Sequence, residues 1–239
     1  MKLTMIGRLS ECLLMAYRTP SESVAHLVPA PLQLVTREGW AFWNVVACRI
    51  EKMRPAGTPR LAGMSYYHVA YRLYVRAGIA SGEIIDGLYF VRSDADSFLI
   101  SEIGNLASDF RFHTAAIRHI EDAGRLIFEV RDSREGAAFL RVALDQKPEP
   151  AKDSCFASAE EAARFLKYRP LGLSCRDGWL RVAEVFRDEA QWRETAVNVE
   201  EARWSFFDSM SQTEVALEIA TRAAPIDYRW RLGRRELLA

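Results

Sequence analysis

The chain has 239 residues, of which 49% are hydrophobic and 11% aromatic, so it can bury a sizeable core. Its 32 basic side chains balance 32 acidic ones, and a formal net charge of zero gives no overall field that would attract nucleic acid or an anionic membrane. No segment approaches the roughly 18 apolar residues of a membrane span, and the N-terminal residues lack the pattern of a signal peptide. We therefore expect a cytoplasmic protein that binds neither nucleic acid nor membrane.

The first predicted elements are a short helix and a central strand. Thr19-Pro20-Ser21-Glu22 has the spacing of a capping box with proline at the first helical position, which predicts a helix start. Residues 40–50 are apolar on both faces for most of their length, which is typical of a strand in the middle of a sheet. The proline and glycine residues between positions 54 and 63 predict a loop.

Residues 66–76 form the most informative stretch, because they alternate between two kinds of side chain and are rich in strand-forming residues. One predicted face is apolar or aromatic and suits a core: Tyr67, Val69, Tyr71, Leu73 and Val75. The other is mostly polar: His68, Ala70, Arg72, Tyr74 and Arg76. This second face either lies in water, as in most half-buried strands, or lines a cavity that holds a ligand. The residues by themselves favour water.

The rest of the chain predicts many short strands and few helices. Strands are expected at 88–91, 114–120, 125–132, 137–145, 171–174, 179–186 and 225–232, and helices at 97–106 and 158–168, while 188–211 stays unassigned. The helix at 97–106 follows from the spacing of Phe98, Ile100, Ile103 and Leu106. These elements predict an α+β fold, mainly an antiparallel β-barrel or cone with a few peripheral helices, in a single domain spanning residues 1–239.

Motifs of known chemistry are missing from the sequence. There is no glycine-rich nucleotide loop, no nucleophile elbow and no HExxH, and the four cysteines lack zinc spacing. His113 and His119 do not form a metal pair, and Asp94 and Asp96 are interpreted as helix caps. We therefore predict no cofactor and no metal, and the motifs leave open whether the protein is an enzyme.

Short segments in the same order and spacing resemble the YqjF-like proteins, a bacterial family of unknown function. The resemblance covers nearly the whole chain and rests on Arg18-Thr19-Pro20, Leu27-Val28-Pro29, Gly39-Trp40-Ala41-Phe42, Gly63-Met64-Ser65, Tyr74-Val75-Arg76, Gly87-Leu88-Tyr89-Phe90, Ser93-Asp94-Ala95 and Asp177-Gly178-Trp179-Leu180. That family is distantly similar to acetoacetate decarboxylase, whose fold is a β-barrel or cone around a buried cavity. The resemblance implies the same fold here, with Arg72 and Tyr74 pointing into the cavity.

The chemistry of acetoacetate decarboxylase is not expected to carry over. That enzyme uses a Schiff-base lysine, whereas no lysine occurs between Met53 and Gln146 here, and Phe112, His113 and Thr114 stand where the enzyme has consecutive lysines. His68 also replaces a glutamate that the YqjF-like pattern tends to carry. An active decarboxylase is therefore the least favoured hypothesis.

The leading hypothesis is a barrel that binds a small carboxylate or enolate in its cavity. Arg72 would anchor the acid with paired hydrogen bonds, and Tyr74 would donate another. His68 and His113 would supply any acid or base step, because histidine titrates near neutral pH. The alternative is a non-enzymatic protein that forms a homo-oligomer or binds a partner through exposed aromatic residues, for which the candidates are Trp192, Trp204, Phe206 and Phe207.

Overall fold

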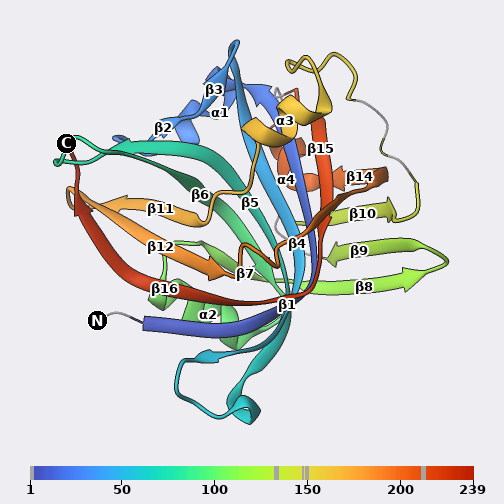
Figure 1. The fold of residues 1–239 in the computed structure, drawn as a ribbon, viewed down its shortest axis with the longest axis horizontal. Helices are drawn as coiled ribbons and strands as arrows, with labels where there is room; N and C mark the ends of the chain where they lie inside the picture. The colour runs from blue at the N-terminus through green and yellow to red at the C-terminus, as the bar shows by residue number, and fades with distance from the viewer. Residues whose placement is uncertain (1–2, 132–134, 147, 149–150, 211–213) are drawn as a thin grey trace.

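The computed structural model describes residues 3–131, 135–146, 148, 151–210 and 214–239. Within these residues, seven strands close into a barrel, and extra strands and a few short helices surround it (Figure 1). In order around the barrel they are β1 (Leu3–Pro20), β16 (Ile226–Leu237), β12 (Trp179–Arg187), β11 (Leu171–Arg176), β6 (Ile84–Ala95), β5 (Met64–Gly78) and β4 (Trp40–Pro55), which pairs again with β1. The pairings are antiparallel except that of β11 with β6. The predicted fold class is confirmed.

Strand β1 closes the barrel, and the sequence patterns did not predict it. One edge of β1 pairs with β4 along nearly its whole length, while its other edge pairs first with β16 and then with β15 (Ala216–Ala223). Strand β13 (Glu194–Ala196) continues the sheet beyond β15. The strand extends as far as Pro20, and the helix α1 (Ser21–Val24) has no side-chain cap, so the predicted capping box at Thr19 was wrong.

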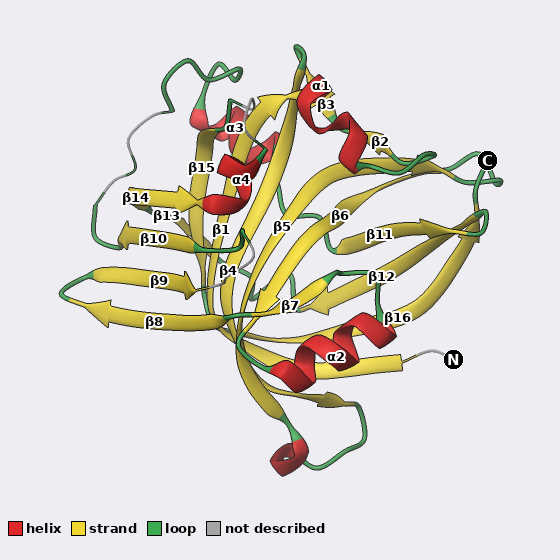
Figure 2. Cartoon of the chain, turned by 180° about the vertical axis from the view of Figure 1, so that it is seen from behind, coloured by secondary structure: helices red, strands yellow, loops and turns green. Residues whose placement is uncertain are grey.

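A second sheet covers part of the outside of the barrel. It is antiparallel, and in the described residues its strands are β14 (Asn198–Trp204), β10 (Ala138–Ala143), β9 (Arg125–Arg131) and β8 (Ala116–Asp122). Leu126, Phe128 and Leu140 of this sheet share one buried cluster with Val69 and Tyr71 of β5. The meander was predicted, although Asp132 of the predicted strand lies outside the described residues. Figure 2 shows β8, β9 and β10 beside the long barrel strands.

Both faces of β5 are buried, which decides between the two interpretations of its alternation. Tyr71 and Leu73 pack outward in the cluster beneath the second sheet, while His68 and Arg72 point into the barrel and are 3% and 4% exposed. The expectation from the residues alone that the His68 face lies in water was therefore wrong. A strand of a closed barrel that is covered on the outside has no solvated face, so alternation alone cannot show whether its polar face is buried.

The remaining elements are short and lie around the barrel. They are η1 (Ala25–Leu27), β2 (Gln33–Leu34), β3 (Thr36–Arg37), η2 (Arg60–Ala62), α2 (Phe98–Ala107), β7 (Phe112–Thr114), α3 (Ala159–Phe165) and α4 (Ser205–Ser209). The predicted N-cap of α3 is confirmed, because the Ser158 hydroxyl accepts from the Glu161 backbone N–H at 3.2 Å, although the Glu161 carboxylate accepts from the Ala157 backbone N–H at 2.8 Å and not from that of Ser158. None of the helices in the described segments is long and apolar enough to cross a membrane.

Helix α2 has the predicted position but an unexpected environment. Its N-cap is Ser97, whereas Asp94 lies buried on β6 beside Arg92 and Asp96 accepts a hydrogen bond from the Tyr67 backbone N–H at 2.7 Å. The interpretation of the two aspartates as helix caps was therefore wrong. Ile100 is buried, but several other apolar side chains of the helix are exposed: Phe98, Leu99, Ile103 and Leu106.

Candidate functional site

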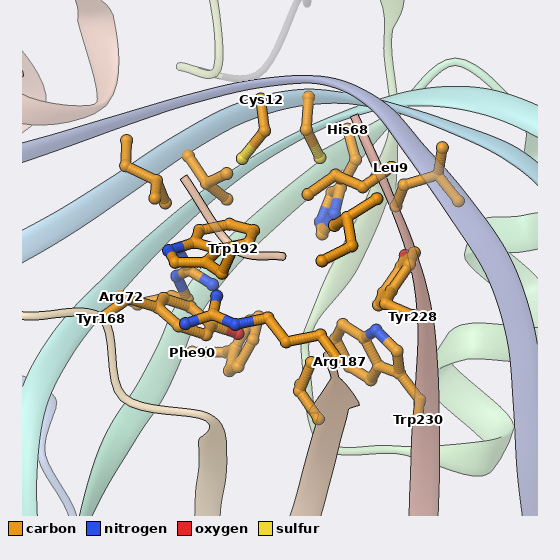
Figure 3. Close-up of a pocket in the computed structure, with 16 residues that line it drawn as sticks. Leu9, Cys12, His68, Arg72, Phe90, Tyr168, Arg187, Trp192, Tyr228 and Trp230 are labelled. Carbon is orange, nitrogen blue, oxygen red and sulfur yellow. The ribbon is translucent and has the colours of Figure 1, made fainter. Parts of the chain in front are cut away.

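A cavity of about 50 Å³ lies inside the barrel. Its lining comes from β1, β4, β5, β6, β12 and β16, together with the segments around Tyr168 and Trp192 (Figure 3). A volume of this size has room for a few water molecules or for the head group of a small ligand. The barrel therefore encloses a small site rather than a wide pore.

Arg72 is the central charged group of this cavity. Its Nε donates to the backbone oxygen of Asn44 at 3.4 Å, and a terminal nitrogen donates to the Asn44 side-chain oxygen. The guanidinium also lies 5.5 Å from the ring of Phe90 and 5.6 Å from the ring of Tyr168. Among the described residues no carboxylate forms an ion pair with Arg72, so its charge is buried without a countercharge.

Tyr74 supports Arg72 rather than lining the cavity. Its hydroxyl donates to the backbone oxygen of Leu166 at 2.6 Å and accepts from Asn44 Nδ2 at 2.9 Å. Since Asn44 in turn accepts from Arg72, the three side chains form one continuous hydrogen-bond chain. The Tyr74 proton is thus already used, and its contribution to the site is to fix the Asn44 amide.

His68 lies in the cavity wall as a neutral imidazole. Burial, with a further contribution from the positive charge of Arg72, lowers the pKa of His68 from 6.5 to about 3. With this pKa, His68 is neutral near pH 7, which does not suit the expected acid or base step. Its Nε2 atom is buried and has no hydrogen-bond partner among the described residues, so it can donate to or accept from a ligand.

Two further polar groups point into the cavity from the last strand. The Tyr228 hydroxyl and Trp230 Nε1 are buried, and neither makes a hydrogen bond of normal geometry with the described residues. The Trp230 N–H lies near enough to the hydroxyl to moderate the large rise that burial causes in the pKa of Tyr228. Buried polar groups without partners are costly, so the two groups and His68 mark places where a ligand or water would bind.

A second arginine closes the other side of the site. The guanidinium of Arg187 lies 3.5 Å from the ring centre of Trp192 and 4.8 Å from that of Tyr168, and its Nε donates to Glu189 at 2.8 Å. Tyr168 therefore contacts both Arg187 and Arg72. Figure 3 shows this stack on one side of the cavity, with His68, Tyr228 and Trp230 on the other side in that view.

Two cysteines contribute an unreactive part of the wall. Cys12 and Cys48 are directly opposite each other on β1 and β4, and both are buried free thiols. Burial raises the pKa of Cys48 to about 12 and that of Cys12 well above its ordinary value. Both side chains therefore behave as small hydrophobic groups at neutral pH.

Of the remaining candidate residues, Trp192 lines the cavity, whereas the others lie outside it. His113 is half-buried on β7, paired in register with Asp94, and does not line the cavity. Of the four aromatic residues considered for an exposed partner surface, Trp204 and Phe207 are buried, and Phe206 and Trp192 pack against the core clusters. These aromatic residues therefore do not form a continuous exposed surface.

Sequence patterns missed several residues of the site, for different reasons. Tyr228 and Trp230 are two residues apart on a predicted strand, so the alternation could have placed them on one face. Tyr168, Arg187 and Trp192 lie at the ends of elements or in a loop, and no local pattern indicates where they point. The hydrogen-bond partner of Arg72, Asn44, occupies a run that otherwise suggests only a buried strand.

The structure is similar to known proteins of one fold. An acetoacetate decarboxylase-like enzyme from Sphingomonas wittichii RW1 superposes with a TM-score of 0.59 at 15% identity, covering 99% of this chain and 92% of that chain. Acetoacetate decarboxylase from Legionella pneumophila gives 0.60 at 12% identity, with 98% and 87% covered. The enduracididine biosynthesis enzyme MppR, complexed with pyruvate, gives 0.57 at 11% identity, with 99% and 90% covered. At these identities the similarity establishes the fold alone.

Sequence comparison places the chain in a family. No curated protein matches it. The family DUF2071, described as an uncharacterised conserved protein, matches residues 7–224, which is most of the chain. The resemblance to a family distantly similar to acetoacetate decarboxylase is thereby confirmed, and the chain belongs to the DUF2071 family.

Proposed function

We propose that the protein binds a small carboxylate or enolate in the barrel cavity and that Arg72 is its anchor. The observation that carries this proposal is an arginine residue that is 4% exposed, lines a cavity, and has no carboxylate partner among the described residues. A buried charge is costly unless it is paired, and an anionic ligand would provide the missing countercharge.

The other polar groups of the cavity suit the same ligand. Trp230 Nε1 can only donate, and the raised pKa of Tyr228 keeps its hydroxyl protonated as a donor. These donors favour a ligand with an accepting oxygen, such as a carbonyl or enolate oxygen, in addition to the carboxylate. Pyruvate, which is bound to the similar structure of MppR, has both groups.

The lysine positions argue against Schiff-base chemistry in this cavity. Lys52, Lys152 and Lys167 are all exposed, and none of them lines the cavity. An imine requires a primary amine next to the bound carbonyl, which neither Arg72 nor His68 can provide. The proposed activity is therefore ligand binding, with no covalent step.

An assembly function through the aromatic residues receives little support from their positions. Trp204 donates to the Tyr17 hydroxyl at 2.8 Å, and Phe207 packs edge-on against Tyr17 at 5.6 Å between ring centres. Both side chains are committed to the interior, where they hold the second sheet against the barrel. The buried arginine makes ligand binding the better supported of the two functions.

A thermal-shift screen of short keto, hydroxy and enol carboxylates tests the proposal, with wild type, Arg72→Met and Arg203→Met side by side. Arg203→Met removes the same charge from an exposed site in the second sheet and serves as the matched control. A ligand at about a hundred times its Kd adds about 2.7 kcal/mol, which raises the Tm of wild type by several degrees. The shift should persist in Arg203→Met and disappear in Arg72→Met. No shift in folded wild type, or an equal shift in all three proteins, would refute the proposal.

A further inference from the structure

A second, larger hollow lies next to the barrel cavity, and most of the charged side chains that line it are cationic. It has a volume of about 1050 Å³ and shares three lining residues with the cavity: Arg187, Ile226 and Tyr228. We refer to it as the outer hollow. The cationic side chains that line it are Arg8, Lys52, Arg54, Arg60, Arg187 and Arg229, against the carboxylates of Asp188 and Asp227. This concentration stands out in a chain whose formal net charge is zero.

The two carboxylates of the outer hollow already have partners. Asp227 forms an ion pair with Arg8 at 3.1 Å, and Asp188 accepts from its own turn, at the backbone N–H of Ala190 and the side-chain amide of Gln191. Arg187 is balanced by Glu189. Within the described residues, the other four cations of the hollow form no ion pair with a carboxylate: Lys52, Arg54, Arg60 and Arg229.

Hydrogen bonds at the end of β4 and in the turn that follows it hold Arg54 in place. Arg54 donates to the backbone oxygen of Lys52 at 2.8 Å and to that of Thr58 at 3.3 Å. Lys52 has a positive φ of 53°, and a Cβ on Gly63 would lie 2.6 Å from the Lys52 backbone oxygen. The chain therefore approaches so closely here that only glycine fits at position 63. Figure 1 shows this turn, with η2, projecting from the barrel beyond β1.

We infer that the outer hollow is a binding site for a small molecule that carries a phosphoryl or pyrophosphoryl group. Guanidinium groups bind phosphate oxygens with paired, charge-assisted hydrogen bonds, and several cations around one hollow match the multiple charges of such a group. The hollow is of the size that small ligands occupy, and a confined site on a chain without net charge does not suit a long polyanion. The site is distinct from the anchor at Arg72, which does not line the outer hollow.

Isothermal titration with inorganic pyrophosphate at constant ionic strength tests this inference. Wild type should bind it saturably at one site, and added sodium chloride should weaken the binding because Lys52, Arg60 and Arg229 are exposed and their charges are screened by salt. Arg54→Gln and Arg229→Gln should each weaken binding by about tenfold or more, as expected for the loss of one charged hydrogen-bond donor. Arg203→Gln in the second sheet removes the same charge elsewhere and should bind like wild type.

Two variants distinguish binding at this site from binding in the barrel cavity. Arg72→Met should leave pyrophosphate binding unchanged, and Arg229→Gln, whose side chain is exposed outside the cavity, should leave any carboxylate binding unchanged. Loss of pyrophosphate binding in Arg72→Met would place the anion in the cavity and overturn the inference. Absence of saturable binding to folded wild type, or equal weakening in Arg203→Gln, would overturn it as well. Because the two proposals depend on different variants, either can fail while the other holds.

Discussion

Asn44 holds Arg72 with both of its oxygen atoms. The two residues are direct cross-strand partners on β4 and β5, and the Asn44 amide is itself fixed by the Tyr74 hydroxyl at 2.9 Å. A neutral amide orients the guanidinium without neutralising it. The charge therefore stays available for the proposed carboxylate ligand.

Replacing Asn44 should affect both stability and binding. In Asn44→Ala a terminal nitrogen of Arg72 loses its side-chain acceptor, while the backbone oxygen that accepts from Nε remains, and we expect the free energy of unfolding to fall by about 1–3 kcal/mol. Carboxylate affinity should also fall because the guanidinium is no longer oriented. Urea denaturation and thermal shift measure the two effects.

The Asn44→Asp variant provides the matched comparison. It keeps the shape of the side chain but gives Arg72 a permanent countercharge, so it should fold at least as well as Asn44→Ala and yet no longer respond to carboxylates. Full carboxylate affinity in either Asn44→Ala or Asn44→Asp would show that Asn44 does not orient Arg72.

Arg72 itself should contribute little to the stability of the ligand-free protein. In Arg72→Met the lost hydrogen bonds and ring contacts are offset by removal of a buried charge without a countercharge, so we expect unfolding free energies within about 1 kcal/mol of wild type. Chemical denaturation of both proteins without ligand measures this difference. A loss of about 3 kcal/mol or more would instead assign Arg72 a structural role.

Breaking the buried ion pair of Arg18 and Glu218 should, by contrast, lower the stability of the protein strongly. Their nitrogen and oxygen lie 2.6 Å apart, and the side chains are 4% and 0% exposed. Glu218→Leu leaves the buried Arg18 without a carboxylate, with the Lys152 backbone oxygen as its remaining hydrogen-bond acceptor, and should cost about 3–5 kcal/mol of unfolding free energy. The double variant Arg18→Met, Glu218→Leu should recover much of that loss. If the double variant were no more stable than Glu218→Leu, the cost would lie in packing rather than in the unpaired charge.

His68 should make the protein less stable in acid. Its pKa is about 3 in the folded chain and near 6.5 when unfolded, so between these values only the unfolded state binds the proton. Stability attributable to this group is therefore complete above about pH 6.5 and falls as the pH decreases towards 3, by at most about 1.4 kcal/mol per pH unit.

The variant His68→Gln isolates this contribution, because it keeps a polar group of similar reach and removes the titration. Unfolding free energies measured between pH 4 and 7 should fall less steeply on acidification for the variant than for wild type. Parallel curves would show that His68 titrates alike in the folded and unfolded states, so that burial does not depress its pKa.

The fold class and the grouping of residues within single strands could be predicted from the amino-acid sequence. Alternation placed His68 and Arg72 on one face of β5, and turn residues separated the strands of the meander and the hairpin of β11 and β12. These features depend on local backbone geometry and on spacing of two residues, which can be read from a short window.

What each face of β5 contacts could not be predicted, because it depends on how distant strands pair. Closure of β1 on β4 turns the His68 face into a barrel wall, and the second sheet covers the Tyr71 face, so an alternation typical of a strand at the surface belongs to one that is buried on both sides. Arg187 and Trp192 reach the cavity from segments with no local signal. Strand pairing and closure of the barrel depend on contacts between distant parts of the chain, which local sequence patterns do not predict.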